Sequence, residues 1–306
     1  MSELSSALSQ AVQACLSQHL PSHCLYMVAS PIGNVADVSV RALHALIGAD
    51  AIACEDTRHS QTWLKAYGIT KPASAWLAVH EHNEQAAAQA VIVKLQAGQR
   101  VAYLCDAGTP GISDPGARLV AAVRTSGGQV MPIPGASSVT TLLSAAGELA
   151  PEGWLFRGFL PHKGQARTQA LSDCATETRP QVLLESPHRI EALASALAAL
   201  GQRLVSVGRE LTKQFEEVDT VPCADLPGWL QAHPHRTKGE FVLLLHALPQ
   251  APADAALGLT TLKVLMSELP LSQAARLAAQ LTGESRKRLY DAGLALAGDE
   301  AQAQQD

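Results

Sequence analysis

Five short apolar runs before Gly135 constrain the fold more than any other feature of the sequence. Each is followed by Gly, Pro or charged residues and then by a segment with helical spacing of apolar residues. The runs are residues 25–29, 51–54, 75–79, 101–105 and 129–133, and the helical segments are 37–48, 61–67, 85–96, 117–125 and 136–146. Continuous apolar runs that end at turn residues are typical of strands buried on both faces. Their alternation with helices predicts an α/β fold with a parallel, doubly wound sheet and right-handed crossovers.

The loop after the fourth run is the strongest local indication of a binding site. Residues 106–116, DAGTPGISDPG, contain three glycines, which adopt backbone torsions closed to other residues, and two prolines, which fix the turns between them. Such a loop is rigid and concave, and it follows a strand of a parallel sheet, where α/β proteins bind ligands. A tight connection that binds no ligand is the alternative interpretation.

The second half of the chain predicts a different sheet and a helical end. Strands are expected at 156–161, 182–185, 203–211 and 240–247, with a helix over 190–200, and short helices at 262–269, 271–281 and 285–297. Some of these strands alternate in polarity, which favours a mixed sheet. The expected organisation is an N-terminal extension (1–20), an N-terminal α/β domain (21–134), a second α/β domain (135–248), and a linker with a C-terminal helical module (249–306).

Composition excludes several classes of protein. Hydrophobic residues are 47% and charged residues 17% of the 306, which fits a helix-rich globular protein and argues against disorder. Residues 1–20 lack the basic start of a signal peptide, and no apolar run approaches the roughly 18 residues of a membrane span. A cytoplasmic protein without a membrane partner is expected. The six cysteines include no Cys-x-x-Cys pair, so we expect no metal site and reduced thiols, most of them in the core.

Charge gives a local rather than a global indication of a partner. The net charge of -5 lacks the basic excess typical of nucleic-acid-binding proteins, but residues 157–213 carry eight positive against five negative residues. If a polyanion binds, this region is its expected contact. The sequence also lacks G-x-G-x-x-G, G-x-x-x-x-G-K-[ST] and G-x-S-x-G, the usual motifs of hydride transfer, phosphoryl transfer and hydrolase chemistry.

Nine motifs in order resemble one known family. They are SPIGN at 30–34, CEDTRHS at 54–60, HEHNE at 80–84, DAGTPGISDPG at 106–116, PIPG at 132–135, FRGFLP at 156–161, ESPHR at 185–189, GRELTK at 208–213 and KGEFVL at 238–243. This set is similar to the ribosomal RNA small-subunit methyltransferase I family, the 16S rRNA cytidine 2'-O-methyltransferases of the tetrapyrrole-methylase class (class III) of S-adenosylmethionine-dependent enzymes. The segment 269–290 resembles the terminal helical module of that family.

The resemblance implies a two-domain fold with S-adenosylmethionine in a cleft between the α/β domains. The loop 106–113 would form the floor of the cleft, and the residues implied to bind the cofactor are Pro31, Asp106, Ala107, Gly108, Thr109, Pro110, Ile112, Ser113, Ser137 and Ser138. The loop pattern alone does not distinguish S-adenosylmethionine from a nucleotide. The resemblance also implies a homodimer with 16S rRNA or the small ribosomal subunit as its partner.

Methyl transfer to a ribose hydroxyl benefits from a general base within hydrogen-bond reach. The candidates at predicted strand ends are Glu55, Asp56, His80, His82 and Glu185. The alternatives are that Glu55 and Asp56 cap the following helix, and that the two histidines bind a metal or bond to their neighbours. Ser186 and His188 lack the spacing of a catalytic triad, and Pro187 favours a structural turn.

The candidate phosphate contacts are basic residues in or near the quoted motifs. They are Arg58, Lys163, Arg167, Arg189, Arg209 and Lys213, and the alternative for each is a solvated surface position. Two other functions share the fold: methylation of a tetrapyrrole or another small molecule, and regulation through cofactor binding without catalysis. The motifs HEHNE, CEDTRHS and ESPHR favour the RNA methyltransferase.

Overall fold

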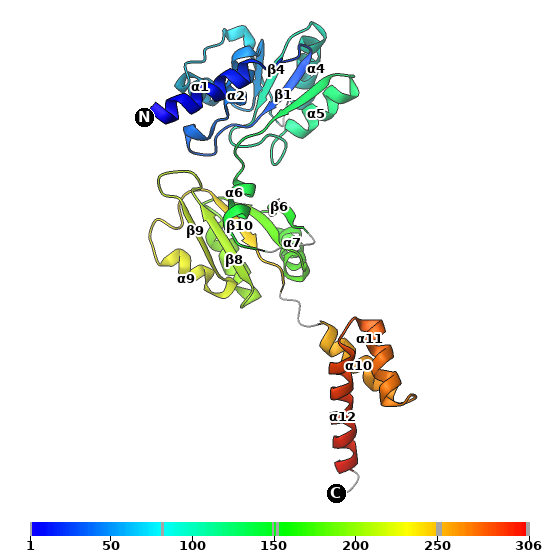
Figure 1. Ribbon diagram of the computed structural model, residues 1–306. Helices are drawn as coiled ribbons and strands as arrows, with labels where there is room; N and C mark the ends of the chain where they lie inside the picture. Colours follow the sequence, from blue (N-terminus) through cyan, green and yellow to red (C-terminus); the bar gives the residue numbers. More distant parts are fainter. Residues whose placement is uncertain (1, 81–82, 149, 151–152, 249–252, 304–306) are drawn as a thin grey trace. The chain divides into compact units, whose positions relative to one another are not determined.

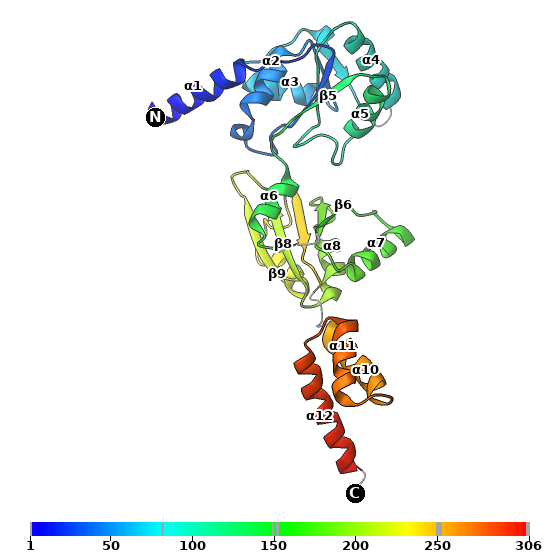
Figure 2. The ribbon, with the colours of Figure 1, turned by 45° about the vertical axis from the view of Figure 1, so that its right-hand side comes forward.

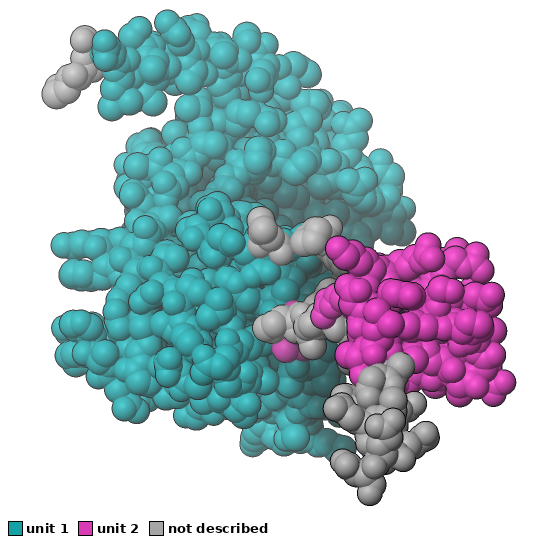
Figure 3. All heavy atoms as spheres, turned by 60° about the horizontal axis from the view of Figure 1, so that its bottom comes forward, with its two compact units in different colours: residues 1–247 teal, residues 248–306 magenta. Residues whose placement is uncertain are grey.

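The computed structural model describes residues 2–80, 83–148, 150, 153–248 and 253–303. Two compact units divide the chain, residues 1–247 and residues 248–306 (Figure 3). No helix in the described ranges is long and apolar enough to cross a membrane.

The first sheet is parallel throughout its described strands, as the sequence predicts (Figure 1). These strands are β1 (Cys24–Val28), β2 (Ala51–Cys54), β3 (Trp76–Ala78), β4 (Val101–Leu104) and β5 (Gln129–Ile133), in the order β3-β2-β4-β1-β5. Strands β1, β2 and β4 are completely buried because helices cover both faces of the sheet.

Alternate residues of these strands belong to two apolar clusters, one on each face. Helices α2 (Val40–Gly48) and α3 (Thr57–Ala66) pack on one face through residues such as Leu46 and Leu64. Helices α4 (Glu84–Gln96) and α5 (Gly116–Thr125) pack on the other through residues such as Val91 and Val123. The doubly wound arrangement is therefore confirmed.

Helix α3 begins four residues earlier than the helix predicted at 61–67. The Asp56 side chain accepts hydrogen bonds from the backbone N–H groups of Arg58 (2.8 Å) and His59 (3.4 Å), so the helix begins at Thr57. This is the helix-cap alternative for Asp56. At the N-terminus, helix α1 (Ser2–Leu16) contacts α2, and the buried Cys15 thiol lies 3.4 Å from His44 Nδ1.

The second sheet is mixed, again as predicted. Its strands are β6 (Leu155–Phe159), β7 (Gln181–Glu185), β8 (Leu204–Arg209), β9 (Glu217–Pro222) and β10 (Phe241–Leu245), in the order β6-β7-β10-β8-β9. Among these described strands, only β6 and β7 pair in parallel. Helix α6 (Ser138–Ala145) packs on one face of this sheet, and α8 (Ile190–Leu197) and α9 (Leu226–Gln231) pack on the other.

The unit of residues 248–306 contains helices α10 (Ala253–Met266), α11 (Leu271–Thr282) and α12 (Arg286–Ala303) (Figure 2). They bury an apolar cluster of their own, which includes Leu262, Ala278 and Leu289. Gly283 ends α11 in the left-handed conformation (φ 76°), as the break expected there requires. Helix α10 begins well before the predicted residue 262.

Candidate active site

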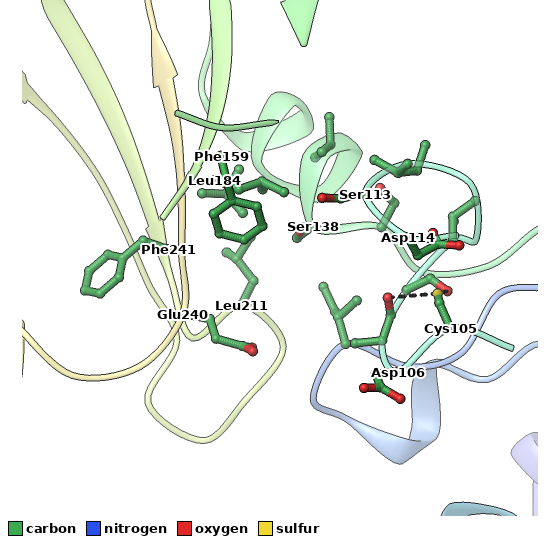
Figure 4. Close-up of a pocket in the computed structure, with 18 of the residues that line it drawn as sticks. Cys105, Asp106, Ser113, Asp114, Ser138, Phe159, Leu184, Leu211, Glu240 and Phe241 are labelled. Atoms are coloured by element: carbon green, nitrogen blue, oxygen red, sulfur yellow. Dashed lines mark hydrogen bonds between the residues drawn. The ribbon is translucent and has the colours of Figure 1, made fainter. Parts of the chain in front are cut away.

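A pocket of about 550 Å³ lies between the loops of the first sheet and one end of the second (Figure 4). Loops after β1, β2 and β4 form one wall. The start of α6, the last residues of β6 and β7, the loop after β8 and the start of β10 form the other wall. The pocket therefore lies at the carboxyl ends of the parallel strands, where the sequence predicts a ligand.

The floor of the pocket is the glycine-rich loop, which pairs with the loop after β1. Ser30 and Gly108 exchange two backbone hydrogen bonds, of 3.0 and 3.1 Å. Gly108 has φ +79°, and a Cβ atom there would lie 3.1 Å from Ile32 Cγ2. The Thr109 hydroxyl donates to the Ala136 carbonyl at 2.9 Å, which ties the loop to the segment before α6.

Asp114 holds the far end of this loop in a fixed shape. Its Oδ2 accepts from the Gly111 N–H at 2.6 Å, and its Oδ1 accepts from the Gly116 N–H at 2.8 Å and the Tyr103 hydroxyl at 3.2 Å. Burial, reinforced by the Asp114 carboxylate, raises the pKa of Tyr103 far above its usual value. The phenol therefore stays protonated and remains a donor to Asp114 at physiological pH.

Eight of the ten residues implied to bind a cofactor line the pocket. These are Asp106, Ala107, Gly108, Thr109, Ile112, Ser113, Ser137 and Ser138. Pro31 and Pro110 are not among its described lining residues, although each is adjacent in sequence to one that is. The sequence predicts no role for the apolar residues of the opposite wall, which are Phe159, Leu184, Leu211, Phe241 and Val242. Several of them lie in the quoted motifs, but no local pattern indicates that β6, β7 and β10 meet at one pocket.

The pocket is acidic. Five carboxylate residues line it, and no Lys, Arg or His is among its described lining residues; the five are Glu55, Asp106, Asp114, Glu185 and Glu240. Glu55 Oε1 also accepts a hydrogen bond of 3.3 Å from the Asp106 N–H. An acidic lining attracts a cationic ligand and disfavours a phosphate group inside the pocket.

The predicted general bases separate into two groups. Glu55 and Glu185 line the pocket. Asp56 caps α3, and the backbone hydrogen bonds from Arg58 and His59 hold its pKa below the usual value, which makes it a poorer proton acceptor. His80 is exposed outside the described lining, with its backbone N–H donating to Asn83 Oδ1 at 2.9 Å.

His82 lies outside the described residues. Within the described part of the chain, no group of three or more His, Cys, Asp or Glu side chains is arranged to hold a metal ion.

Of the two predicted bases that line the pocket, Glu185 is the more deeply buried, with its side chain fully covered. Its Oε1 accepts from the Ser186 N–H at 2.9 Å and lies 3.2 Å from Arg189 Nε. Arg189 in turn donates to the Leu160 carbonyl at 2.5 Å. The other carboxylate oxygen, Oε2, is buried and has no hydrogen-bond partner among the described residues.

The six predicted phosphate contacts also differ in their surroundings. Arg58 and Lys163 are exposed, whereas Arg167 is half-buried and donates to the Pro161 carbonyl. Arg189 pairs with Glu185 as described.

The remaining two cations hold the loop after β8. Arg209 is 6% exposed and donates to the carbonyls of Lys238 and Phe215. Lys213 pairs with Glu210 at 2.8 Å and with Glu240 at 2.9 Å. Of the six, Arg58 and Lys163 are therefore the most available to a polyanion.

Cys105 is the cysteine among the described lining residues of the pocket, and its side chain is buried. Burial, with a smaller effect of Asp114 and Glu55, raises its pKa to about 12. The thiol is therefore protonated at physiological pH and is not a nucleophile. All six cysteines are buried and none forms a disulfide, which confirms that they lie in the core, whereas their reduced state stays a prediction.

Comparison with known proteins agrees with this geometry. Residues 24–227 match the sequence model of the Tetrapyrrole (Corrin/Porphyrin) Methylases. The chain therefore belongs to the tetrapyrrole methylase family. Residues 251–297 match a second model, the RsmI C-terminal HTH domain.

Within that family, the similar curated proteins are named ribosomal RNA small subunit methyltransferase I. The chain is 42% identical to the one from Haemophilus influenzae over 89% of this chain and 96% of that protein. It is 43% identical to the one from Escherichia coli O157:H7, over 87% of this chain and 93% of that protein.

Solved structures show the same fold at low identity. Uroporphyrin-III-C-methyltransferase from Thermus thermophilus gives a TM-score of 0.51 at 19% identity, covering 72% of this chain and 94% of that one. Diphthine synthase gives a TM-score of 0.54 at 15% identity, covering 73% of this chain and 90% of that one. The two-domain tetrapyrrole-methylase fold expected from the motifs is thereby confirmed, and the protein is a methyltransferase by family.

Proposed function

We propose that this protein transfers the methyl group of S-adenosylmethionine to the ribose 2'-hydroxyl of a cytidine in small-subunit (16S) ribosomal RNA. The observation that supports this most is the similarity, at 42% identity over nearly the whole chain, to ribosomal RNA small subunit methyltransferase I proteins. The choice of a cytidine and of its 2'-hydroxyl follows from the motif resemblance, and the acidic pocket is consistent with a cationic methyl donor.

The residues of the pocket fit S-adenosylmethionine. Its volume of about 550 Å³ is within the usual range for small-molecule sites. The loop from Asp106 to Ser113 presents backbone groups in a fixed shape, and Ser137 and Ser138 offer hydroxyl groups at the opposite side. The carboxylates favour the positive sulfonium over the negative phosphates of a nucleotide. When bound, the cofactor would supply an electrophilic methyl group.

The contribution of the protein to the reaction is positioning and removal of a proton. With the cofactor bound, the protein would hold the ribose hydroxyl in line with the methyl group that the cofactor supplies, and a base of the protein would accept the hydroxyl proton. We assign the role of proton acceptor to Glu55, because its side chain lines the pocket and is only half-buried. Asp56 is engaged in the helix cap instead.

RNA phosphates would contact cations outside the acidic pocket. We assign Arg58, in the first turn of α3, and Lys163, four residues after Phe159 of the pocket wall. Replacing both by Gln is expected to weaken RNA binding and to reduce the slope of log affinity against log salt by about 1.4, because each single-strand phosphate contact contributes about 0.7.

The matched control is Lys65→Gln, which removes the same charge from the last turn of α3. Lys65 lies seven residues, or about 10 Å, further along that helix. Binding measured by fluorescence anisotropy at several salt concentrations decides the assignment. An unchanged slope in the double variant, or an equal change in the control, would contradict it.

Three further expectations belong to this proposal. The family resemblance favours a cytoplasmic homodimer, and light scattering at micromolar concentration measures its mass.

The domain boundaries at residues 21–134 and 135–248 also stay predictions. The packing of α6 on the second sheet is consistent with a boundary near Gly135.

The direct test is incubation of the protein with isotopically labelled S-adenosylmethionine and small ribosomal subunits. Digestion of the RNA to nucleosides and mass spectrometry should locate the label in 2'-O-methylcytidine. A parallel reaction with a tetrapyrrole acceptor tests the small-molecule alternative. Label that enters only the tetrapyrrole would overturn the proposal.

A further inference from the structure

The loop after β8 (residues 210–216) contacts the loop after β1, so it joins the second sheet to the first. The backbone N–H of Asn34 donates to the Thr212 hydroxyl at 3.1 Å, although the two residues lie far apart in the sequence. The Lys213 side chain lies so close to Gly33 that a Cβ atom there would clash with Lys213 Cγ. The absence of a side chain at Gly33 therefore makes room for the stem of the lysine.

Two carboxylates of the second sheet hold the ammonium group of Lys213. It lies 2.8 Å from Glu210 Oε1 and 2.9 Å from Glu240 Oε2. Glu210 Oε1 also accepts from the backbone N–H of Glu240 at 2.9 Å, so the three residues form one hydrogen-bonded group. Burial alone would lower the pKa of Lys213, but the hydrogen bonds to Glu210 and Glu240 raise it above its usual value. Two of the three donors of the ammonium group are thus engaged by carboxylates, whose charge disfavours an RNA phosphate beside them.

The residues joined in this way carry part of the pocket lining. Leu211 and Glu240 line the pocket, and Figure 4 shows both on the side that faces Asp106. Ile32, in the loop after β1, also lines the pocket and packs against an apolar cluster that includes Leu211. The contact between the two loops therefore lies at the edge of the pocket, where it sets the distance between the two walls.

Two residues of the loop 210–216 have a backbone conformation that non-glycine residues rarely adopt. Glu210 has φ +49° and Thr212 has φ +67°, and a positive φ is a genuine outlier for a β-branched residue such as threonine. Backbone strain of this kind persists only where the surrounding structure fixes it, and it concentrates at functional sites. Here the hydrogen bond from Asn34 and the ion pair with Lys213 fix the two strained residues.

We propose that Lys213 is a positioning residue of the cofactor pocket and not a phosphate contact. Its stem packs on Gly33 of one wall and its ammonium group holds Glu240 of the other, so one side chain fixes the two walls relative to each other. Thr212 supports the same contact through Asn34. Walls that are held in place before binding present a preformed site, which raises the affinity for S-adenosylmethionine. This inference rests on the proposed function and deepens it, because it assigns the residues that keep the cofactor pocket assembled.

Lys213→Met removes the ammonium group and keeps an unbranched stem against Gly33. We expect the Kd of S-adenosylmethionine, measured by calorimetry, to rise about tenfold, which is the usual effect of losing hydrogen bonds to a charged group. Loss of a positive charge beside an acidic pocket would by itself strengthen binding of a cationic ligand, so weaker binding isolates the positioning effect. The kcat at saturating cofactor and the salt dependence of RNA binding should stay unchanged, whereas loss of a phosphate contact would lower the salt slope by about 0.7.

The matched control is Lys238→Met, which removes the same charge from an exposed position two residues before Glu240 and should leave the Kd unaltered. Thr212→Val and Thr212→Ser form a second pair that leaves every charge in place. Valine removes the acceptor for the Asn34 N–H and should raise the Kd about fivefold, whereas serine keeps that acceptor and should retain the affinity. This pair tests the inference even if Lys213→Met fails to fold.

Each other outcome overturns the inference in a recognisable way. A normal Kd in Lys213→Met, or in Thr212→Val, would show that the contact between the loops does not position the pocket. A lower salt slope with normal cofactor affinity would make Lys213 a phosphate contact, and an equal rise of the Kd in Lys238→Met would reduce the effect to charge. If the unaltered protein binds S-adenosylmethionine but methylates no RNA, the proposed function fails, while the Kd values still decide the role of Lys213.

Discussion

Replacing Gly108 by Val is expected to abolish binding of S-adenosylmethionine. Gly108 has φ +79°, a conformation that a β-branched residue adopts only under strain. A Cβ atom there would also lie 3.1 Å from Ile32 Cγ2 and 3.6 Å from the Ala136 carbonyl oxygen, and valine adds two more methyl groups. The change would therefore push apart the two loops that Ser30 and Gly108 join at the floor of the pocket.

The matched control is Gly127→Val. Gly127 has nearly the same backbone conformation (φ +80°), but a Cβ atom there would meet no described atom within 4 Å, and the residue is outside the described pocket lining. Both variants carry the backbone strain, and only Gly108→Val disturbs the pocket. Calorimetric titration with S-adenosylmethionine, alongside thermal unfolding, should show binding in the control alone. Normal affinity in Gly108→Val would exclude the loop as the cofactor site.

Arg189→Met is expected to destabilise the protein by about 3 kcal/mol. Removing the guanidinium leaves the fully buried Glu185 carboxylate without its counter-charge, and breaking a buried ion pair from one side typically costs about 3–5 kcal/mol. The lower end applies because Arg189 retains 16% exposure. A urea titration measures the loss, with the exposed Lys163→Met as the control for removal of a cation.

The double variant Glu185→Leu, Arg189→Met separates a structural pair from a phosphate contact. Because the buried charge is then absent, it should be more stable than Arg189→Met alone. If Arg189→Met keeps full stability and lowers only RNA affinity, the cation is available to RNA and its pairing with Glu185 contributes little.

The first sheet could be predicted closely because its central strands β1, β2 and β4 are short, fully buried runs that end at turn residues. Strand β9 escapes prediction for the opposite reason. As an edge strand it leaves Glu217 to Thr220 half-buried or exposed, so its sequence resembles a polar connection. Helix α7 (Gly164–Thr176) escapes prediction as well, since it buries only Cys174 completely and carries almost no apolar stripe.

One wall of the pocket could be predicted from the sequence, and the opposite wall could not. The glycine-rich loop is contiguous in sequence, and its composition alone indicates a binding function. The opposite wall comes from Phe159, Glu185 and Phe241, which are brought together only by the pairing of β6, β7 and β10. The sequence does not determine whether Asp56 is a base or a helix cap, or whether Arg189 contacts phosphate or pairs with Glu185. Each role depends on the partner that the side chain contacts in the folded protein.

The most direct measurement replaces the target nucleotide by 2'-deoxycytidine in otherwise unaltered small-subunit RNA. If the ribose 2'-hydroxyl is the acceptor, incorporation of label from S-adenosylmethionine should stop, because the attacking oxygen is absent. The same RNA with cytidine at that position serves as the positive control. Continued labelling of the deoxy-substituted nucleotide would show that the base receives the methyl group and would contradict ribose methylation.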